Sequence, residues 1–256
     1  MRSLPGLMII RWATSGEKTL SLAGLLMSSV EIYVVVEGPT EQTFVRDVLA
    51  PHMAPGKVYL HPALIGKPGH KGGDIRFDKA KNDIGNFLRQ RDDTYITTMF
   101  DCFRIDSEWP GKADALRQVK NGTAFTASQK AETLETATRT EIVRIFPGCG
   151  SENRFVPYIE MHEFEALLFS DADILADKTL IDVALIRKIL EKCDNPEEIN
   201  DDPANAPGKR LESLKVGYRK IAMGKTISEA IGIAGIRKQC PHFNDWLTKL
   251  ENLKTP

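Results

Sequence analysis

Apolar, β-rich runs alternate with helix-like segments through the first two thirds of this chain of 256 residues. The run VEIYVVV ends at Val36, a second strand is expected at 57–65, and TYITTMF and RFVPYIEM are the third and fourth. Helical spacing of apolar residues follows, for example over 77–91. The alternation predicts an α/β fold with a mostly parallel, Rossmann-like sheet flanked by helices on both faces, because parallel strands need long crossover connections.

The same pattern divides the chain into three parts. Residues 1–29 precede the first strand, and we expect them to be an N-terminal extension with little structure of its own. Residues 30–170 hold all the predicted strands and form the α/β domain. From 171–256 no convincing strand pattern remains, so we expect a helical C-terminal region.

The composition excludes several classes of protein. The net charge is -1, so a site for a polyanion has to be a local basic patch. The four cysteines are widely spaced, which argues against a zinc knuckle or a disulfide scaffold and favours reduced thiols in a cytoplasm. No stretch is long and apolar enough for a transmembrane span. We therefore expect a soluble cytoplasmic protein without a membrane partner.

Acidic residues follow three of the predicted strands. Glu37 follows the first strand and Asp101 the third, and the fourth is followed by His162, Glu163 and Glu165. Ligands of open parallel sheets bind at the carboxyl ends of the strands. Carboxylates gathered there repel one another unless a cation lies between them, and oxygen ligands suit Mg²⁺ or Mn²⁺. The pattern predicts a metal site, although a single acid after a strand is often only a helix cap or a solvated turn.

The segment HEFEALLF has a second pattern. Helical spacing places His162, Glu165 and Phe169 on one side and Phe164, Leu167 and Leu168 on the other, apolar side. His162 and Glu165 are thus candidates to orient a water, contact a phosphate or bind metal. A hydrogen-bonded structural histidine is the alternative for His162. The segment is not His-Glu-x-x-His, so a zinc protease is not indicated.

Two basic segments are candidates for phosphate binding. The loop GKPGHKGGD carries Lys67, Lys71, Gly72 and Gly73; its glycines allow backbone N–H groups to approach a phosphate. Its alternative interpretation is a flexible surface loop. It contains no Walker A sequence, so it does not indicate an ATPase. The second segment follows Ala-Pro-Gly and consists of Lys209 and Arg210, for which solvated surface is the alternative.

Longer motifs resemble a known family. The stretch VVVEGPTEQTFV resembles the first motif of Toprim domains, in which a strand ends on a glutamate followed by glycine. From about residue 30 to 250 the chain is identified as a member of the bacterial DUF4276 family. The motifs that carry this identification are KGG, TTMFD, RFVPYIEMHEFEALLFSD, PEEIN, APGKR and IRKQCPHFNDWL.

The resemblance implies a Toprim-like fold and phosphodiester chemistry with Mg²⁺, as in topoisomerases, primases and OLD-type nucleases. It makes Glu37 a general acid/base or metal ligand and Asp101 the first acid of an Asp-x-Asp metal motif. The sequence Asp101-Cys102-Phe103 lacks the second aspartate. Asp106 or an acid within 162–165 is the candidate to take the role of that second aspartate. It also implies an ABC/SMC-like or AAA ATPase as partner in a phage-defence module.

Two functions from different classes follow. The first is a Mg²⁺-dependent nuclease acting on DNA or RNA, with Glu37, Asp101, His162 and Glu165 as catalytic residues and Glu37, Asp101 and Glu163 as metal ligands. The second is a non-catalytic module that binds nucleic acid, a nucleotide or a partner ATPase. We favour the nuclease, because acids on three strands are not needed for a structural edge. Divalent-dependent cleavage that depends on Glu37 would separate the two.

Overall fold

The computed structural model describes residues 29–66, 75–120, 125–199 and 203–256, and the expectation for residues 1–29 therefore falls almost wholly outside the described part. The centre of the fold is a parallel sheet in the order β2-β1-β3-β4, with β5 also paired to β3. The strands are β1 (Val30–Val36), β2 (Val58–Leu64), β3 (Thr94–Asp101), β4 (Phe155–Val156) and β5 (Ile159–Glu160). This confirms the predicted parallel α/β architecture, and the first three strands lie where the sequence placed them.

The expected fourth strand is divided into two short pieces. Pro157 has no N–H for the ladder, and the next residue, Tyr158, pairs with a side chain instead of a strand. The Thr98 hydroxyl accepts from Tyr158 N and donates to Tyr158 O, each at 2.9 Å. These two bonds interrupt the ladder between β4 and β5, and β5 then pairs with the carboxyl end of β3.

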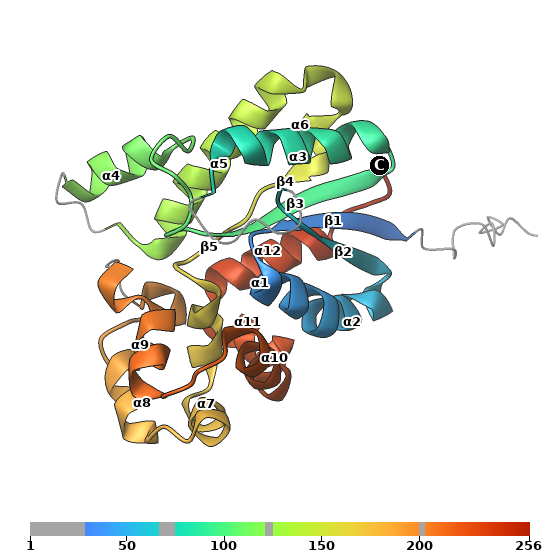
Figure 1. The fold of residues 1–256 in the computed structure, drawn as a ribbon. Helices are drawn as coiled ribbons and strands as arrows, with labels where there is room; N and C mark the ends of the chain where they lie inside the picture. Colours follow the sequence, from blue (N-terminus) through green and yellow to red (C-terminus); the bar gives the residue numbers. More distant parts are fainter. Residues whose placement is uncertain (1–28, 67–74, 121–124, 200–202) are drawn as a thin grey trace, which may run out of the picture.

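Both faces of the sheet are covered by helices, as Figure 1 shows. Along β1 the side chains alternate: Ile32 and Val34 lie in one core cluster and Val35 in the other. One face is covered by α3 (Phe77–Gln90), α4 (Lys112–Lys120), α5 (Ala127–Ile145) and α6 (Ser151–Arg154). The other is covered by α1 (Pro39–Phe44), a π-helical turn (Val45–Leu49), α2 (Ala50–Met53) and the C-terminal α12 (Pro241–Glu251).

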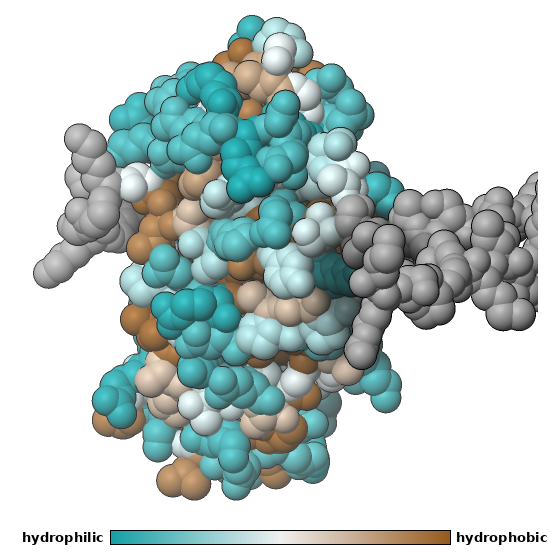
Figure 2. Space-filling model, turned by 90° about the vertical axis from the view of Figure 1, so that its right-hand side faces the viewer, coloured by the Kyte–Doolittle hydropathy of each residue, from teal (hydrophilic) through white to brown (hydrophobic). Residues whose placement is uncertain are grey.

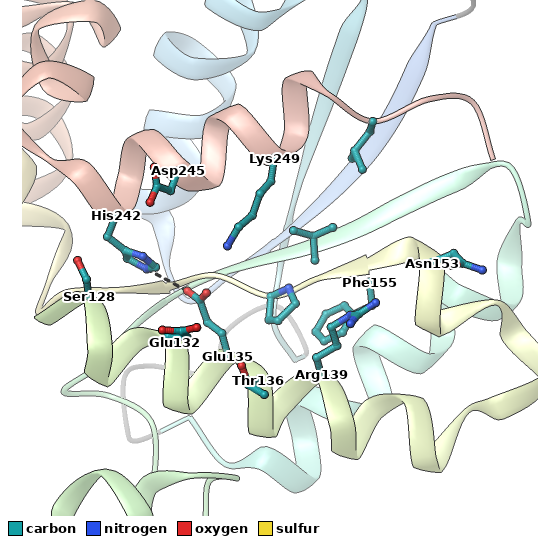
Figure 3. Close-up of a pocket in the computed structure, with 13 residues that line it drawn as sticks. Ser128, Glu132, Glu135, Thr136, Arg139, Asn153, Phe155, His242, Asp245 and Lys249 are labelled. Atoms are coloured by element: carbon teal, nitrogen blue, oxygen red, sulfur yellow. Dashed lines mark ion pairs between the residues drawn. The ribbon is translucent and has the colours of Figure 1, made fainter. Parts of the chain in front are cut away.

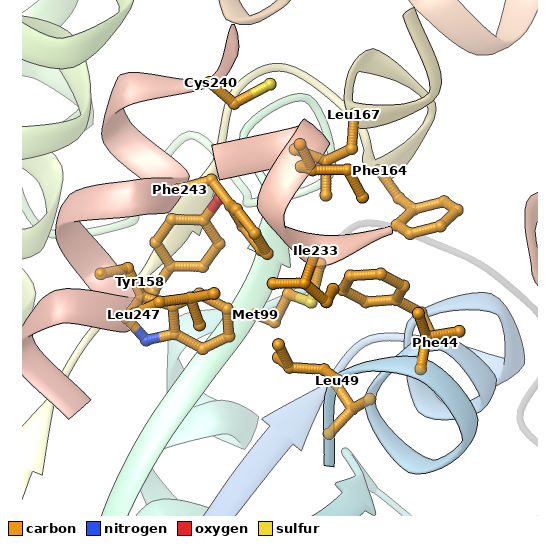
Figure 4. Close-up of a cluster of buried hydrophobic side chains, with 14 of the residues drawn as sticks. Phe44, Leu49, Met99, Tyr158, Phe164, Leu167, Ile233, Cys240, Phe243 and Leu247 are labelled. Atoms are coloured by element: carbon orange, nitrogen blue, oxygen red, sulfur yellow. The ribbon is translucent and has the colours of Figure 1, made fainter. Parts of the chain in front are cut away.

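The C-terminal region is helical, as predicted. Its other α-helices are α7 (Ala172–Thr179), α8 (Val183–Leu190), α9 (Pro207–Leu214), α10 (Lys220–Ile231) and α11 (Ile233–Gln239). Its core continues into that of the sheet, because one buried cluster contains Val34, Phe164, Ile233 and Trp246 together. Figure 4 shows this cluster, with Phe243 and Leu247 of α12 packed beside Tyr158 and Met99.

Trp246 joins α12 to the sheet. Its indole N–H donates to Thr97 Oγ1 at 2.9 Å, and its ring stacks on Tyr158 with centroids 4.2 Å apart. A buried aromatic pair of this kind contributes roughly 0.5–1.5 kcal/mol beyond the area that it buries. Phe243 and Trp246 are therefore packing residues, since both are buried.

The segment expected as an α-helix over 162–169 is different. It is a 3-10 helix, Phe164–Ser170, and His162 lies before its first residue. All side chains from Phe164 to Phe169 are buried, because the segment runs between the sheet and the C-terminal helices. The predicted division into a polar and an apolar side was therefore wrong: a segment enclosed all round has no solvent-facing side.

The surface offers no wide apolar area on the face drawn in Figure 2, where hydrophobic residues form small separate groups among hydrophilic ones. Within the described residues, no helix combines the length and the apolar character that a membrane crossing requires.

Candidate functional site

Five carboxyl groups gather at the carboxyl edge of the sheet, and we call them the acidic cluster: Glu37, Glu41, Asp101, Glu163 and Glu165. Glu37 directly follows β1, Asp101 ends β3, and Glu163 precedes the 3-10 helix that contains Glu165. The Asp101 Oδ1 atom accepts the Phe164 N–H at 3.1 Å, which fixes the start of that helix against β3. The structure thus brings together the acids that the sequence placed at three strand ends.

Glu37 forms an ion pair with Arg104. Arg104 Nε donates to Glu37 Oε1 at 2.8 Å, and the side chain of Glu37 is 16% exposed. Burial raises the pKa of Glu37, and the hydrogen bond and charge of Arg104 oppose that rise. Its second oxygen, Oε2, is buried without a hydrogen-bond partner in the described part of the chain. Glu37 therefore presents one free oxygen to the cluster.

Glu41 belongs to the cluster although the sequence analysis did not select it. It lies four residues after Glu37, in the first turn of α1, and its Oε2 accepts the Gly38 N–H at 2.9 Å. The start of α1 is therefore built from Gly38, Pro39 and Glu41. Burial raises the pKa of Glu41 to about 7, and the nearby charges of Glu37 and Glu165 add to the effect. The spacing of the two acids in EGPTE was the signal that could have identified it.

Asp101 is at the centre of the cluster. Burial raises its pKa well above the usual range, and the carboxylates around it raise it further. These carboxylates are Glu41, Glu37, Glu165 and Glu163. Asp106, considered as a substitute for the missing second aspartate, lies elsewhere: burial raises its pKa, and the charges that act most on it are Arg76, Glu108 and Asp78. The acids beside Asp101 are Glu163 and Glu165 instead.

The C-terminal helices close the other side of the cluster. Gly208 N donates to Glu163 Oε2 at 2.9 Å, and Lys220 Nζ lies 3.3 Å from Glu165 Oε1. A Cβ atom on Gly208 would lie 2.8 Å from both Glu163 Oε2 and Lys220 Nζ, so a larger residue would displace the ends of these two side chains. Burial lowers the pKa of Lys220, but Glu165 and Glu163 outweigh it and raise the pKa overall. Gly208 and Lys220 are distant in the sequence from the acids; Gly208 belongs to the APGKR motif, whereas no motif quoted above includes Lys220.

The charge of the site is unbalanced. Five carboxylates face two cations, Arg104 and Lys220, so three negative charges remain when all the acids are ionised. Among the described side chains, no three His, Cys, Asp or Glu groups are already arranged as a set of metal ligands. The donors are nevertheless hard oxygens, and Glu37 Oε2 is unused. The residues fit a divalent cation by chemistry and charge, and cation binding would draw the carboxylates closer together.

The remaining predicted site residues are His162, which is adjacent to Glu163 in the sequence, and the two basic segments. His162 is buried and stacks on Phe103 with ring centroids 5.0 Å apart. Lys209 and Arg210 lie in the first turn of α9, next to Gly208; Lys209 pairs with Glu212 at 3.2 Å, and Arg210 Nε donates to Asn205 O at 2.8 Å. Lys67, Lys71, Gly72 and Gly73 lie outside the described residues.

A separate cleft of about 680 Å³ lies away from these acids, between α5, β4 and α12 (Figure 3). At one end His242 Nε2 lies 2.9 Å from Glu135 Oε1, and both side chains are buried. The pair also occupies the open edge of β5, because Glu135 accepts Ile159 N–H and His242 Nε2 lies 3.2 Å from Ile159 O. The pair links α5 to α12 and covers an unpaired strand edge.

Comparison with known proteins identifies a family for this chain. Residues 36–251 match the family described as "Domain of unknown function (DUF4276)". No curated protein and no solved structure matches the chain. The match includes every member of the acidic cluster, as well as Arg104, Gly208 and Lys220. This chain therefore belongs to the DUF4276 family.

Proposed function

We propose that this protein is a Toprim-type nuclease that cleaves phosphodiester bonds with Mg²⁺ or Mn²⁺ at the acidic cluster. The observation that carries the proposal is the excess of buried negative charge at the carboxyl edge of a parallel sheet. Carboxylates with strongly raised pKa values destabilise the fold when ionised, so their accumulation calls for a function. A divalent cation with a phosphate substrate is the partner that such a set of oxygens accepts best.

Glu37, Asp101, Glu41 and Glu163 are the residues that would hold the cation. When bound, the cation neutralises phosphate charge and makes a coordinated water a better nucleophile. The resemblance gives Glu37 either role, ligand or general acid/base; as a base it would take a proton from the attacking water through Oε2, while Arg104 orients the other oxygen. Lys220, 40% exposed in its side chain, reaches solvent beside Glu165 and can bind a phosphate oxygen. In this proposal Glu163 and Glu165 supply the charge that the missing second aspartate would have given.

The test is Glu37→Gln, which keeps the shape and removes the charge. Cleavage of labelled DNA and RNA is measured with Mg²⁺, with Mn²⁺ and with EDTA. We expect the rate to fall by about 10²-fold or more, the usual scale for a positioned acid/base. Asp101→Asn should behave alike, and the double variant should add little, because residues acting as a unit are not additive. Glu132→Gln, an exposed change on α5, is the matched control. Wild-type cleavage that persists in Glu37→Gln would refute the assignment.

The second candidate is a non-catalytic module that binds nucleic acid, a nucleotide or a partner protein. The observation in its favour is the position after Asp101, where buried Cys102 is followed by Phe103 and not by an acid. A non-catalytic module would bind its ligand but would not cleave DNA or RNA with Mg²⁺, with Mn²⁺ or in EDTA. Mn²⁺ binding, measured by the loss of its free electron-spin signal, tests the metal site independently of cleavage, and Asp101→Asn should abolish it.

We extend the proposal to a cytoplasmic phage-defence module that includes an ABC/SMC-like or AAA ATPase. What supports this part is the resemblance of VVVEGPTEQTFV to Toprim motifs. The cleavage assay is therefore run with and without the ATPase encoded in an adjoining reading frame. Adjoining frames without an ATPase would remove this part and leave the nuclease proposal standing.

A further inference from the structure

The connection between α9 and α10 has the sequence KVGYRK, residues 215–220, and three of its six residues are cations. Lys215 follows the last residue of α9, Arg219 precedes the first residue of α10, and Lys220 begins that helix. Within the described part of the chain, neither Lys215 nor Arg219 forms an ion pair, and Arg219 is exposed. Their charges are therefore available to a ligand.

This connection lies against the acidic cluster. Lys220 Nζ is 3.3 Å from Glu165 Oε1, and Lys220 also lies beside Gly208 of α9. The Tyr218 hydroxyl is buried without a hydrogen-bond partner among the described residues. Burial raises the pKa of Tyr218, and the charges of Glu165, Glu212 and Glu163, of which Glu165 and Glu163 belong to the acidic cluster, raise it further. A cationic segment thus borders a negatively charged centre, the arrangement needed by a polyanion whose scissile group meets a metal.

The tip of the connection is apolar. Val216 is 94% exposed, the highest value among the exposed large hydrophobic residues of the described part, and Gly217 has a positive φ of 76° that turns the chain back. The side chain contributes nothing to the core from this position. A branched aliphatic group between phosphate-binding cations can contact the face of a base or a sugar, and base faces are open only where a strand is unpaired.

The first turn of α9 adds two further cations. Lys209 is 63% exposed in its side chain, and its pair with Glu212 is a surface interaction that contributes little to stability. Arg210 is fixed by Asn205 O through Nε. We call Lys209, Arg210 and residues 215–220 the basic rim.

We propose that the basic rim holds the phosphate backbone of a single-stranded nucleic acid, with Lys215 and Arg219 on phosphates beside the scissile one and Val216 against an unpaired base or sugar. The proposal rests on the proposed function, since it assigns the substrate-binding surface of the same site. It also explains how a chain with a net charge of -1 gathers a polyanion.

The test measures binding in EDTA, so that cleavage plays no part. The probes are fluorescent single-stranded DNA, single-stranded RNA and duplex DNA, and fluorescence anisotropy is recorded over a series of salt concentrations. Lys215→Ala/Arg219→Ala should weaken single-strand binding at least about tenfold. Each lost phosphate contact lowers the slope of log K against log[salt] by about 0.7, so the double variant should lose about 1.4. Val216→Ser should reduce the preference for single strands over duplex.

The matched control is Lys249→Ala/Lys254→Ala, which removes the same charge at the opposite, amino edge of the sheet, where Tyr95 Oη donates to Lys254 O at 2.7 Å. It should leave binding and slope unchanged, and thermal melting should show both double variants folded. Wild-type protein that binds none of the probes, or a rim variant with wild-type affinity and slope, would overturn the proposal. The two proposals are tested separately, because binding in EDTA does not require cleavage. Glu37→Gln should lose cleavage and still bind the probes as the wild type does.

Discussion

Glu41→Gln tests directly whether the acidic cluster is a source of instability in the metal-free protein. Glu41 is 7% exposed, and its carboxyl group lies among the other acids of the cluster. Glutamine has nearly the same shape, and its side-chain oxygen can still accept the Gly38 N–H that Glu41 Oε2 accepts at 2.9 Å. The NH₂ group of the glutamine can donate a hydrogen bond to a neighbouring carboxylate of the cluster. The change therefore removes one buried charge and keeps the start of α1.

The magnitude follows from the pKa of Glu41, which burial raises from an ordinary 4.5 to about 7. The folded protein binds this proton more tightly than the unfolded chain does, so the free energy of unfolding falls as the pH rises from about 4.5 to about 7. Above pH 7 the full penalty is present, and at about 1.4 kcal/mol per pKa unit it amounts to roughly 3 kcal/mol. The variant lacks this penalty at high pH and has no advantage below pH 4.5.

The assay is thermal unfolding in EDTA at several pH values between 4.5 and 8. At pH 8 we expect Glu41→Gln to melt about 6–12 °C above the wild type, at roughly 2–4 °C per kcal/mol for a chain of this size. The gain should shrink steadily toward pH 4.5. Added Mg²⁺ should stabilise the wild type more than the variant, since the variant has one ligand fewer. Glu132→Gln, exposed on α5, is the control. Equal melting temperatures at pH 8, or a gain that does not depend on pH, would refute the reasoning.

Two further predictions concern the buried contacts of α12. His242→Gln should lower the free energy of unfolding more at pH 5.5 than at pH 9. Burial lowers the pKa of His242, but Glu135 and Glu197 outweigh burial and raise the pKa overall. The ion pair therefore contributes fully below about pH 6.5, and its contribution is lost as the pH rises through the pKa of the folded protein. Equal losses at both pH values, measured by urea unfolding, would contradict this. Trp246→Phe should lower the free energy of unfolding by about 1–3 kcal/mol, because it removes the indole bond to Thr97 Oγ1; a loss well under that range would show that the hydroxyl finds another partner at no cost.

Much of the framework could be read from local patterns. Strands such as Val30–Val36 and the helix Phe77–Gln90 lie within a residue of their predicted bounds, because period-2 and helical spacing of apolar residues report burial directly. The acids after the strands were also predicted, because parallel strands deliver their carboxyl ends to one edge. The assignment of these acids to catalysis stays a prediction.

What local patterns could not show are contacts between distant segments. Glu197 of the PEEIN motif accepts the backbone N–H groups of His242 and Phe243 at 2.9 and 2.8 Å, and Glu198 accepts Ala127 N–H at 2.9 Å. These two acids therefore cap α12 and α5, a role that nothing in their own surroundings indicates. Lys220 likewise reaches the acidic cluster only because α10 packs on α1 and on the 3-10 helix.

The bond between Trp246 and Thr97 joins residues 149 positions apart, and Tyr95 and Lys254 are separated by 159. One face of the sheet is therefore completed by a helix, α12, that is synthesised long after β1 and β3. Until then α1, the π-helical turn and α2 cover only part of that apolar face, and forming contacts across such long separations is slow. A nascent or truncated chain that stops before residue 241 should thus be a substrate for chaperones and proteases.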